Sequence, residues 1–431
     1  MSLNDIKRTH YARQIDRSLI GQQVRVGGWI EDMRDIGKLA FATIRDVTGK
    51  CQVIVTGNNL QSALQAPRQS AVIVRGVVQE SKARDFSVEL KASEFIVLTE
   101  AVHPLPIDPT GRVESAIDKR LDARALDLRN PRIQAIFHLR SAGLKVVREA
   151  LGLQGFIEVN TPKIIGSASE GGANLFGFEY FAKRKAYLAQ SPQLYKEQLT
   201  LGLDRVFEIG PYFRAENSHT VRHLSEFTSV DIEAGFLDYE EVMDILEQLV
   251  RRVALEFNEN HKAELKEAGA KEISITKIDR LTYEQCIDEL AKEGEKMEFG
   301  DDLSDSALRR LGSLHPGFYF IIDWPLNLKP FYIHEKEENT KLSKSFDLQY
   351  NYLELASGGR RLHSPAMLRK RLAEQGLNPD SFEEHLKAFD WGMPPHSGWG
   401  LGYDRLMMVL TGQQNVREVV LYPRDTERLT P

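Results

Sequence analysis

Residues 205–236 read RVFEIGPYFRAENSHTVRHLSEFTSVDIEAGF, and this stretch decides the fold of the chain. Its apolar positions predict two β-strands around a polar loop, the pattern of an antiparallel hairpin. Four charged residues lie on or beside strands that otherwise suit a protein core: Arg214, Glu216, Asp231 and Glu233. Buried charges are costly unless they are paired or contact a charged ligand. The stretch therefore predicts either structural salt bridges within a sheet or a site for a charged ligand.

The length and composition of the chain limit what it can be. Its 431 residues exceed the size at which a single core stops growing, so two or more domains are expected. The formal net charge of −6 argues against a generally basic coat, and a nucleic acid would have to meet local Lys and Arg patches. Cys51 and Cys286 lack the spacing of a zinc site or disulfide framework, which favours the reducing cytoplasm. No apolar run is long enough for a signal peptide or a membrane span, so no membrane partner is expected.

The first hundred residues predict a β-barrel. Five strand-like runs are separated by turn signals, and a short helical run follows the third. Five strands with a helix in that place are typical of an OB-fold, a partly open barrel that often binds oligonucleotides. An SH3-like barrel or another small barrel would fit the composition as well. The five runs are Val24–Met33, Leu39–Asp46, Cys51–Thr56, Ala71–Glu80 and Phe86–Leu98.

The sequence changes character after the barrel. Residues 105–130 are rich in proline and charge, which predicts a hinge between an N-terminal domain of residues 1–104 and a larger domain of residues 131–431. Asn130 and Pro131 suit the start of a long amphipathic helix in the larger domain.

Three motifs make the larger domain similar to the class II aminoacyl-tRNA synthetases. The segment from FRAE to RHLSEFTSVDIE resembles motif 2 of the aspartyl, asparaginyl and lysyl members. The helix and short strand of residues 131–162 resemble motif 1, and GWGLGYDRL resembles motif 3. Their order is the family's order, which makes the resemblance specific. It implies an α+β fold in which an OB-fold barrel joins a mixed, mainly antiparallel sheet flanked by helices. It also implies a homodimer built on motif 1, of the compact archaeal or eukaryotic type without the bacterial insertion.

The resemblance to the aspartyl members implies that the chain binds ATP and L-aspartate, forms aspartyl-adenylate and transfers aspartate to the 3′ end of tRNA(Asp). Arg214 and Arg405 are the expected catalytic residues. Arg214 would bridge the substrate carboxylate and the α-phosphate, and Arg405 would stack on the adenine opposite Phe227. The full expected ATP set is Arg214, Glu216, Arg222, His223, Leu224, Phe227, Glu354, Gly402 and Arg405.

The amino-acid pocket is expected to carry positive charge. Lys196, within SPQLYK, matches the lysine that the aspartyl enzymes place near the substrate side chain, and Arg361 matches the arginine that pairs with it. Two cations suit a carboxylate better than an amide, so the pair favours aspartate over asparagine. Without the family, a lone lysine on a helix indicates only a solvated face. The resemblance assigns aspartate binding to Glu170, Gln193, Lys196, Arg214, Asp231, Ser357 and Arg361.

A metal site is expected beside the ATP phosphates. The resemblance assigns Mg²⁺ to Glu354 and Ser357, which offer the oxygen ligands that a hard ion prefers. Without the family, this segment indicates only the polar rim of a hairpin. The glycines of GWGLG have a spacing like that of a dinucleotide loop, but no βαβ unit follows them, so a Rossmann site is not expected.

The barrel is expected to bind the tRNA anticodon. The resemblance assigns anticodon contacts to Arg34, Phe41 and Gln52, whose chemistry suits stacking on a base and hydrogen bonds to base edges. From the residues alone, Phe41 could equally be a core aromatic and the other two surface side chains. Discriminating archaeal relatives use a tryptophan and a lysine to reject tRNA(Asn). Glu31 and Ala83 occupy those places here and match neither residue, so charging of tRNA(Asn) beside tRNA(Asp) stays an open hypothesis.

Three other functions compete with this hypothesis. An asparaginyl-tRNA synthetase would differ chiefly in its choice of amino acid. A synthetase-like asparagine synthetase would need no anticodon domain, which this chain carries. A non-catalytic, RNA-binding relative would have lost some site residue, whereas Arg214, Glu354 and Arg405 are all present.

Overall fold

The structure is a computed structural model that describes residues 6–166, 174–217 and 220–431. It divides into two compact units, Met1–Asn130 and Pro131–Pro431. In the described ranges, no helix is long and apolar enough to cross a membrane.

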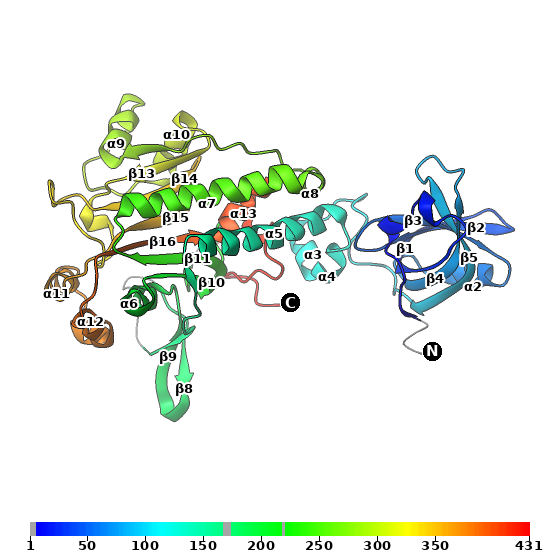
Figure 1. Cartoon of the computed structure of the whole chain (residues 1–431), viewed down its shortest axis with the longest axis horizontal. Coiled ribbons are helices and arrows are strands. Elements are labelled where there is room, and N and C mark those ends of the chain that lie inside the picture. The colour runs from blue at the N-terminus through cyan, green and yellow to red at the C-terminus, as the bar shows by residue number, and fades with distance from the viewer. Residues whose placement is uncertain (1–5, 167–173, 218–219) are drawn as a thin grey trace. The chain divides into compact units, whose positions relative to one another are not determined.

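The first unit contains a closed barrel with the strand order β1-β2-β3-β5-β4 (Figure 1). Along β2 and β3 buried side chains alternate with partly exposed ones, so one face of each strand fills the barrel core. Strand β1 passes so close to β2 that a Cβ added at Gly28 would lie 2.3 Å from the Arg45 carbonyl oxygen. The OB-fold prediction is confirmed. The elements are β1 (Gln23–Asp35), β2 (Leu39–Arg45), β3 (Lys50–Thr56), α2 (Asn59–Gln65), β4 (Ala71–Glu80), β5 (Val88–Thr99), α3 (Ile117–Asp122) and α4 (Arg124–Asp127).

The second unit is built on a mixed, mainly antiparallel sheet in the order β12-β13-β14-β15-β16-β11-β10-β6. The hairpin expected within residues 205–236 forms β10 and β11, near one end of this sheet. Strand β16 lies between β11 and β15 and pairs with both in antiparallel fashion. The strands are β6 (Ile157–Glu158), β10 (Arg205–Phe213), β11 (Glu226–Gly235), β12 (Asp279–Thr282), β13 (Phe318–Ile322), β14 (Ser345–Tyr350), β15 (Leu353–Arg360) and β16 (His396–Gly402).

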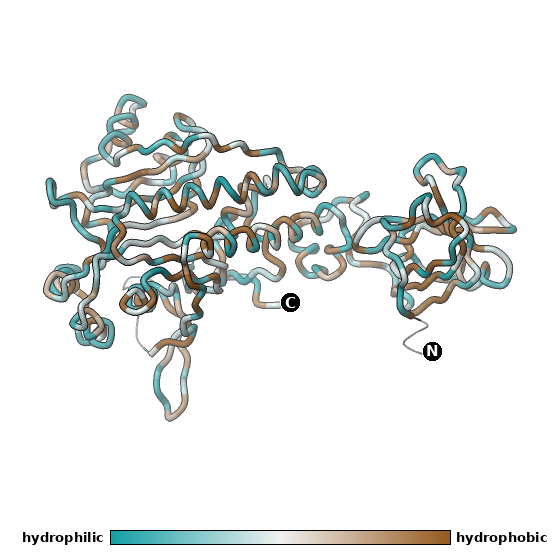
Figure 2. Tube along the Cα trace, in the orientation of Figure 1, coloured by the Kyte–Doolittle hydropathy of each residue, from teal (hydrophilic) through white to brown (hydrophobic). Residues whose placement is uncertain are grey.

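Helices cover the sheet of the second unit. The long helices α5 (Pro131–Leu153) and α7 (Tyr239–Asn260) lie side by side, and α7 packs against β15 and β16 (Figure 1). A capping box between Asp238 and Glu241 begins α7, and its hydropathy alternates along the helix as one buried face requires (Figure 2). Helix α6 (Gln193–Leu203) packs against β10 and β11, and α13 (Tyr403–Thr411) contacts β11. The predicted α+β fold is therefore confirmed.

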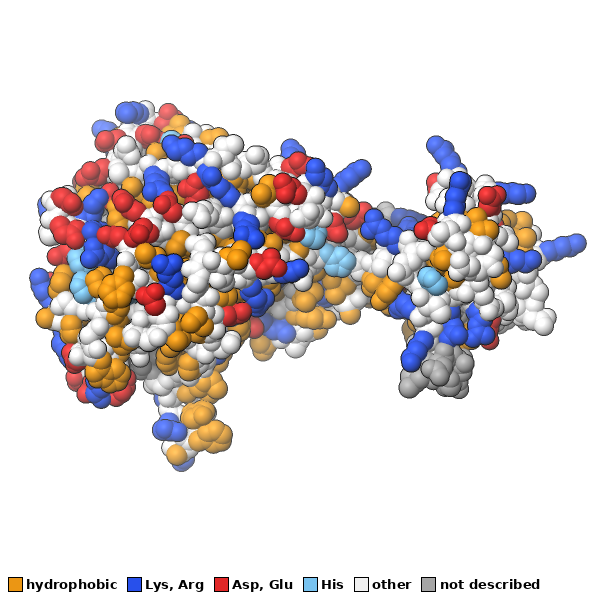
Figure 3. Space-filling view, in the orientation of Figure 1, with side chains coloured by type: hydrophobic (Ala, Val, Ile, Leu, Met, Phe, Trp, Pro, Cys, Tyr) orange, Lys and Arg blue, Asp and Glu red, His pale blue; other side chains and the backbone are white. Residues whose placement is uncertain are grey.

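Smaller elements surround this body. A three-stranded sheet has the order β7-β9-β8, and the interval between α7 and β13 forms short helices and the short strand β12 rather than a further domain. On the visible face of this unit acidic and basic side chains are intermixed, without a continuous basic coat (Figure 3). The elements are β7 (Ile164–Ile165), β8 (Gly177–Tyr180), β9 (Arg184–Leu188), α8 (Lys262–Ala268), α9 (Tyr283–Lys292), α10 (Asp305–Leu314), α11 (Pro365–Glu374) and α12 (Glu383–Phe389).

Candidate active site

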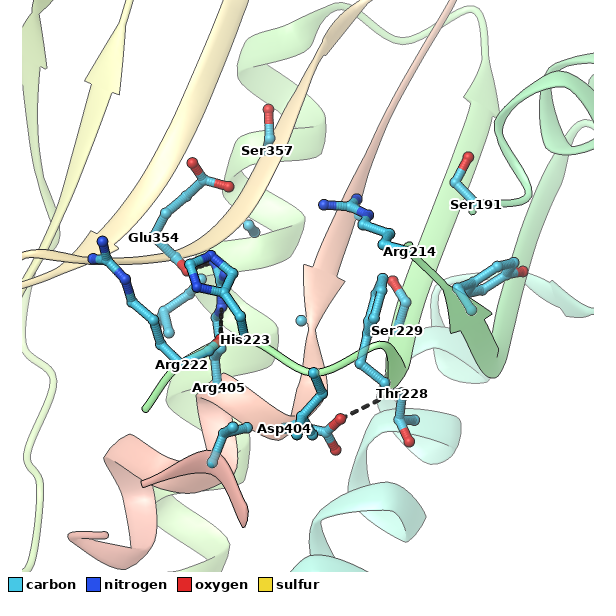
Figure 4. Close-up of a pocket in the computed structure, with 18 of the residues that line it drawn as sticks. Ser191, Arg214, Arg222, His223, Thr228, Ser229, Glu354, Ser357, Asp404 and Arg405 are labelled. Atoms are coloured by element: carbon cyan, nitrogen blue, oxygen red, sulfur yellow. Dashed lines mark hydrogen bonds between the residues drawn. The ribbon is translucent and has the colours of Figure 1, made fainter. Parts of the chain in front are cut away.

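A cavity is formed by the β10–β11 hairpin, β15, β16 and the first turn of α13 (Figure 4). The cavity brings together many of the residues expected from the sequence. They are Arg214, Glu216, Arg222, His223, Leu224, Phe227, Asp231, Glu354, Ser357, Gly402 and Arg405.

Arg214 follows the last residue of β10 and points into the cavity (Figure 4). Its guanidinium carbon lies 5.1 Å from the ring centre of Phe227, and its Nη1 lies 4.0 Å from the Glu216 carboxylate. The hairpin register, which places Tyr212 opposite Phe227, sets this arrangement. A guanidinium that stacks on a ring keeps its planar fork of donors available for anionic oxygens.

Arg405 reaches the same cavity from α13. Its Nη1 donates to the backbone oxygen of Glu354 at 2.8 Å, and its Nε donates to that of Arg222 at 3.3 Å. Arg405 therefore ties α13 both to β15 and to the loop after β10. Burial lowers the pKa of Arg405, but the side chain of an arginine stays charged at neutral pH. Two guanidinium groups that are distant in the sequence thus share one cavity.

The loop between β10 and β11 adds a further cation and an imidazole. Arg222 forms an ion pair with Asp305, the first residue of α10. His223 Nδ1 lies 2.6 Å from the Thr220 hydroxyl. Burial, together with the charges of Arg405 and Arg222, lowers the pKa of His223. The imidazole is therefore neutral at pH 7, and Arg222 adds a positive charge to the cavity lining.

A buried chain of charges lies behind the cavity wall. Asp231 lines the cavity and is 3.1 Å from Lys196 Nζ, which also lies 3.7 Å from Glu233. Glu233 is in turn 3.0 Å from Arg361 Nε. Lys196, Glu233 and Arg361 are at most 3% exposed. Because cations and carboxylates alternate along the chain, each buried charge has an opposite partner.

The residues expected to bind aspartate therefore fall into two groups, one that lines the cavity and one that is buried behind it. Arg214, Asp231 and Ser357 line the cavity, whereas Gln193, Lys196 and Arg361 are absent from its lining and are buried. Glu233, which the resemblance does not assign, is a further partner in this region. Glu170 lies outside the described residues.

The glycines of GWGLG make room for the carboxylates of Glu233 and Asp231. A Cβ added at Gly398 would lie 2.3 Å from a carboxylate oxygen of Glu233, and one at Gly400 would lie 2.9 Å from a carboxylate oxygen of Asp231. Real Cβ contacts are not this short, so a larger residue at either position would displace the carboxylate. The glycine run thus packs β16 closely against β11.

Glu354 and Ser357 line the cavity from β15, and Asp347 of β14 pairs with Ser357 in the sheet register. Burial and the negative charge of Asp347 raise the pKa of Glu354, against the opposing charges of Arg405 and other cations. Asp347 is itself paired with Lys329 at 2.8 Å, whereas Glu354 is exposed to the cavity that it lines, where its carboxylate offers a hard ion an oxygen ligand, so the residues fit the expected metal. In the described ranges, no group of three His, Cys, Asp or Glu side chains could hold a metal ion. Water and phosphate oxygens would have to complete the shell, as is usual for Mg²⁺.

On the barrel, Arg34 and Phe41 face each other across β1 and β2. Arg34 is exposed and Phe41 is partly exposed, so both can reach a ligand. Gln52, on β3, donates through Nε2 to the Glu89 carboxylate at 2.6 Å. Glu31 is buried and forms ion pairs with basic residues of the barrel, including Lys50.

The cavity also contains residues that the sequence did not reveal. Asp404 accepts a hydrogen bond from the Thr228 backbone at 2.8 Å (Figure 4), and it pairs with Arg140 of α5 at 2.6 Å. The Ser229 hydroxyl donates to Asp231 at 2.5 Å. Ser229 could have been found, because it lies two residues from Asp231 on one strand and therefore on the same face. Gln190, Ser191, Tyr212, Leu355, Ala356, Gly400 and Val416 complete the lining.

Comparison with known families gives two matches. The family described as tRNA synthetases class II (D, K and N) matches residues 116–426. The family described as OB-fold nucleic acid binding domain matches residues 24–98.

Similar proteins extend over the whole chain. The aspartate–tRNA(Asp/Asn) ligase of Methanothermobacter thermautotrophicus is 46% identical over 438 residues, which covers 100% of both chains. The ligase of the same description from Methanocaldococcus jannaschii is 45% identical and covers 99% of this chain and 98% of its own. Among solved structures, asparaginyl-tRNA synthetase from Pyrococcus horikoshii with asparaginyl-adenylate has a TM-score of 0.92 at 31% identity, covering 99% of this chain and 100% of that one. A putative aspartyl-tRNA synthetase from Leishmania major has a TM-score of 0.90 at 30% identity, covering 100% and 97%.

Proposed function

The chain belongs to the class II tRNA synthetases of the D, K and N type, and we propose that it activates L-aspartate with ATP and joins it to tRNA(Asp) and tRNA(Asn). The names of the two similar archaeal ligases support both the amino acid and the pair of tRNAs. The single observation that carries the proposal is the convergence of Arg214 and Arg405 on one cavity, beside buried cations that suit an acidic substrate.

In the proposed first step, the nucleotide occupies the cavity between Phe227 and Arg405. Phe227 and the Arg405 guanidinium offer two flat surfaces for the adenine, and Glu216 offers an acceptor for its amino group. Arg214 binds the α-carboxylate of aspartate and the α-phosphate together, which holds the attacking oxygen in line with the phosphorus. The carboxylate oxygen forms the new bond to phosphorus as pyrophosphate leaves, and Arg222 neutralises charge on the departing phosphates.

Mg²⁺ is proposed to bind at Glu354 and Ser357. When bound, the ion supplies charge neutralisation at the ATP phosphates. The position of both residues on β15 and in the lining of the cavity supports this assignment, because their side chains offer the oxygen ligands that a hard ion prefers. Arg405, through its hydrogen bond to the Glu354 backbone, holds β15 in place for this role.

In the proposed second step, the terminal ribose 3′-hydroxyl of tRNA attacks the carbonyl carbon of the adenylate and AMP leaves. The ester bond of aspartyl-tRNA forms as the mixed anhydride breaks, and the hydroxyl proton passes to a phosphate oxygen or solvent. No side chain has to act as a covalent nucleophile. Arg34, Phe41 and Gln52 would contact the anticodon, with Phe41 as the stacking surface.

Asparagine activation is the second candidate, because the Pyrococcus horikoshii enzyme has a very similar fold. The fold does not separate the two amino acids, since the two solved structures match almost equally well. Charge favours aspartate. Lys196 is buried beside Asp231 and Arg361 beside Glu233, and an aspartate side chain could take over pairing from these carboxylates, whereas an amide could not.

We further propose a cytoplasmic homodimer. Large apolar side chains are exposed at the end of α5 and in the short strands after it: Leu153 is 76% exposed, Ile157 46% and Ile164 50%. Clustered exposed apolar residues mark interaction surfaces, and the class II resemblance assigns the dimer interface to this segment. Sedimentation of the protein and of a Leu153→Glu/Ile157→Glu variant tests it, since a monomeric wild type would contradict the proposal.

Two assays test the proposed function. ATP–pyrophosphate exchange should proceed with L-aspartate and be at least a hundredfold weaker with L-asparagine. Aminoacylation with tRNA(Asp) and tRNA(Asn) transcripts should yield aspartyl esters on both. Stronger exchange with asparagine than with aspartate would show that asparagine is the substrate. A lack of product on tRNA(Asn) would contradict the dual tRNA specificity but not the activation of aspartate.

A further inference from the structure

A second cluster of buried charged side chains lies beside the buried residues of the expected aspartate set, and the proposed mechanism does not use it. Its members are Glu197 of α6, His385 of α12 and His396 of β16, with exposed fractions of 0%, 3% and 0%. Both imidazole Nε2 atoms lie 3.6 Å from the same carboxylate oxygen of Glu197. Three chain segments that are distant in the sequence therefore meet at one carboxylate.

The hydrogen bonds around the imidazoles fix where their protons lie. His396 Nδ1 is 2.7 Å from the Pro394 carbonyl oxygen, which can only accept, so Nδ1 carries a proton. His385 Nδ1 is 3.2 Å from the Gln198 amide nitrogen, which can only donate, so the proton of a neutral His385 is on Nε2. Both Nε2 atoms face the same Glu197 oxygen, so the two imidazole rings hold that carboxylate from two sides.

Glu197 remains charged in this setting. Burial alone would raise the pKa of Glu197, but its contacts with His385 and His396 hold the pKa well below the usual range. Other charged or titratable groups also face the cluster. Arg361 interacts with the Glu197 charge and donates its backbone N–H to the His396 carbonyl at 2.9 Å, and His363 lies near His396.

The cluster connects directly to a proposed substrate residue. Gln193, one turn before Glu197 on α6, donates through Nε2 to the other Glu197 oxygen at 2.6 Å. A carboxylate accepts only, so this contact decides which end of the Gln193 amide faces Glu197. The carbonyl oxygen of Gln193 is then the end left to accept a hydrogen bond from elsewhere.

We propose that the Glu197–His385–His396 cluster is a positioning device that orients the Gln193 amide so that its carbonyl oxygen accepts from the ammonium group of the aspartate substrate. This inference rests on the proposed function. Glu197 is held between the two imidazoles, and its other oxygen holds the Gln193 amide. Removing the carboxylate or one of the rings therefore releases the Gln193 amide and lowers the affinity for aspartate.

Two variants test the proposal by ATP–pyrophosphate exchange, with aspartate and ATP varied in turn. Glu197→Gln offers one carbonyl oxygen where the carboxylate offers two, so the KM for aspartate should rise about tenfold while the KM for ATP changes less than twofold. His396→Asn keeps a donor for the Pro394 carbonyl and removes the ring that faces Glu197, so it should raise the KM for aspartate without a matching rise in the KM for ATP. It also serves as the test where Glu197→Gln does not fold.

The control is Asp323→Asn, which removes another buried carboxylate of the same unit, paired with Lys336 at 2.7 Å and absent from the cavity lining. It should lower the melting temperature and leave the KM for aspartate unchanged. A merely structural role of the cluster predicts this same behaviour for Glu197→Gln and His396→Asn, and that result would overturn the inference. A wild type that activates no aspartate at any pH would instead refute the proposed function, and the inference with it.

Discussion

The substitution Lys196→Gln tests the proposed amino-acid selectivity most directly. Lys196 Nζ lies 3.1 Å from Asp231, and an aspartate side chain bound in the proposed way would replace or join that partner. At this separation and an effective dielectric constant of about 20, one pair of unit charges interacts by about 5 kcal/mol. Desolvation offsets part of this, and truncating one partner of a buried, hydrogen-bonded pair costs about 2–5 kcal/mol.

The expected loss for Lys196→Gln is therefore roughly thirtyfold to several thousandfold in kcat/KM for aspartate. The assay is ATP–pyrophosphate exchange with aspartate and with asparagine, because a neutral substrate does not depend on the lysine charge. The matched control is Lys336→Gln, which removes a lysine paired with Asp323 at 2.7 Å, outside the cavity lining. Equal losses for both amino acids, or a loss below threefold for aspartate, would refute the reasoning.

Three further predictions concern the nucleotide, the metal and the tRNA. Arg405→Lys should raise the KM for ATP about tenfold and lower kcat in pyrophosphate exchange, because an ammonium cannot stack as a guanidinium does; an unchanged KM would contradict the adenine contact. Because the pKa of Glu354 is raised, protonation should compete with Mg²⁺ as pH falls, so the Mg²⁺ concentration for half-maximal exchange should rise from pH 7.5 to pH 5.5 in the wild type and stay flat in Glu354→Gln. Phe41→Ala should raise the KM for tRNA about tenfold or more in aminoacylation, since base stacking contributes about 1–3 kcal/mol, while leaving pyrophosphate exchange unchanged; a loss in both assays would indicate misfolding instead.

Local patterns predicted much of the fold. The barrel strands, the hairpin of residues 205–236 and the capped helix that follows it depend on alternation, turn residues and caps, all of which are visible within a few residues. Strand β12 was missed, since its four residues, Asp279–Thr282, are mostly polar and lie at a sheet edge. Such short strands are stabilised by pairing with a neighbour rather than by their own sequence.

The site was less predictable than the fold. The resemblance named Arg214, Arg405 and Glu354, which all line one cavity. It did not reveal that Lys196 and Arg361 share Glu233 as a partner, although the charge of Glu233 on an apolar strand was the odd feature of the sequence. Such pairings join segments that are distant in the chain, so no local pattern encodes them.

The central position of β16 has a consequence for synthesis of the protein. Before residues 396–402 leave the ribosome, β11 and β15 have no partner between them, and the sheet exists only as two separate halves with open edges. Long-range strand pairing of this kind is slow to form, and open edges invite aggregation. The nascent polypeptide therefore remains without catalytic capacity until its last strand inserts, and this late insertion is the step at which chaperones would offer the greatest protection.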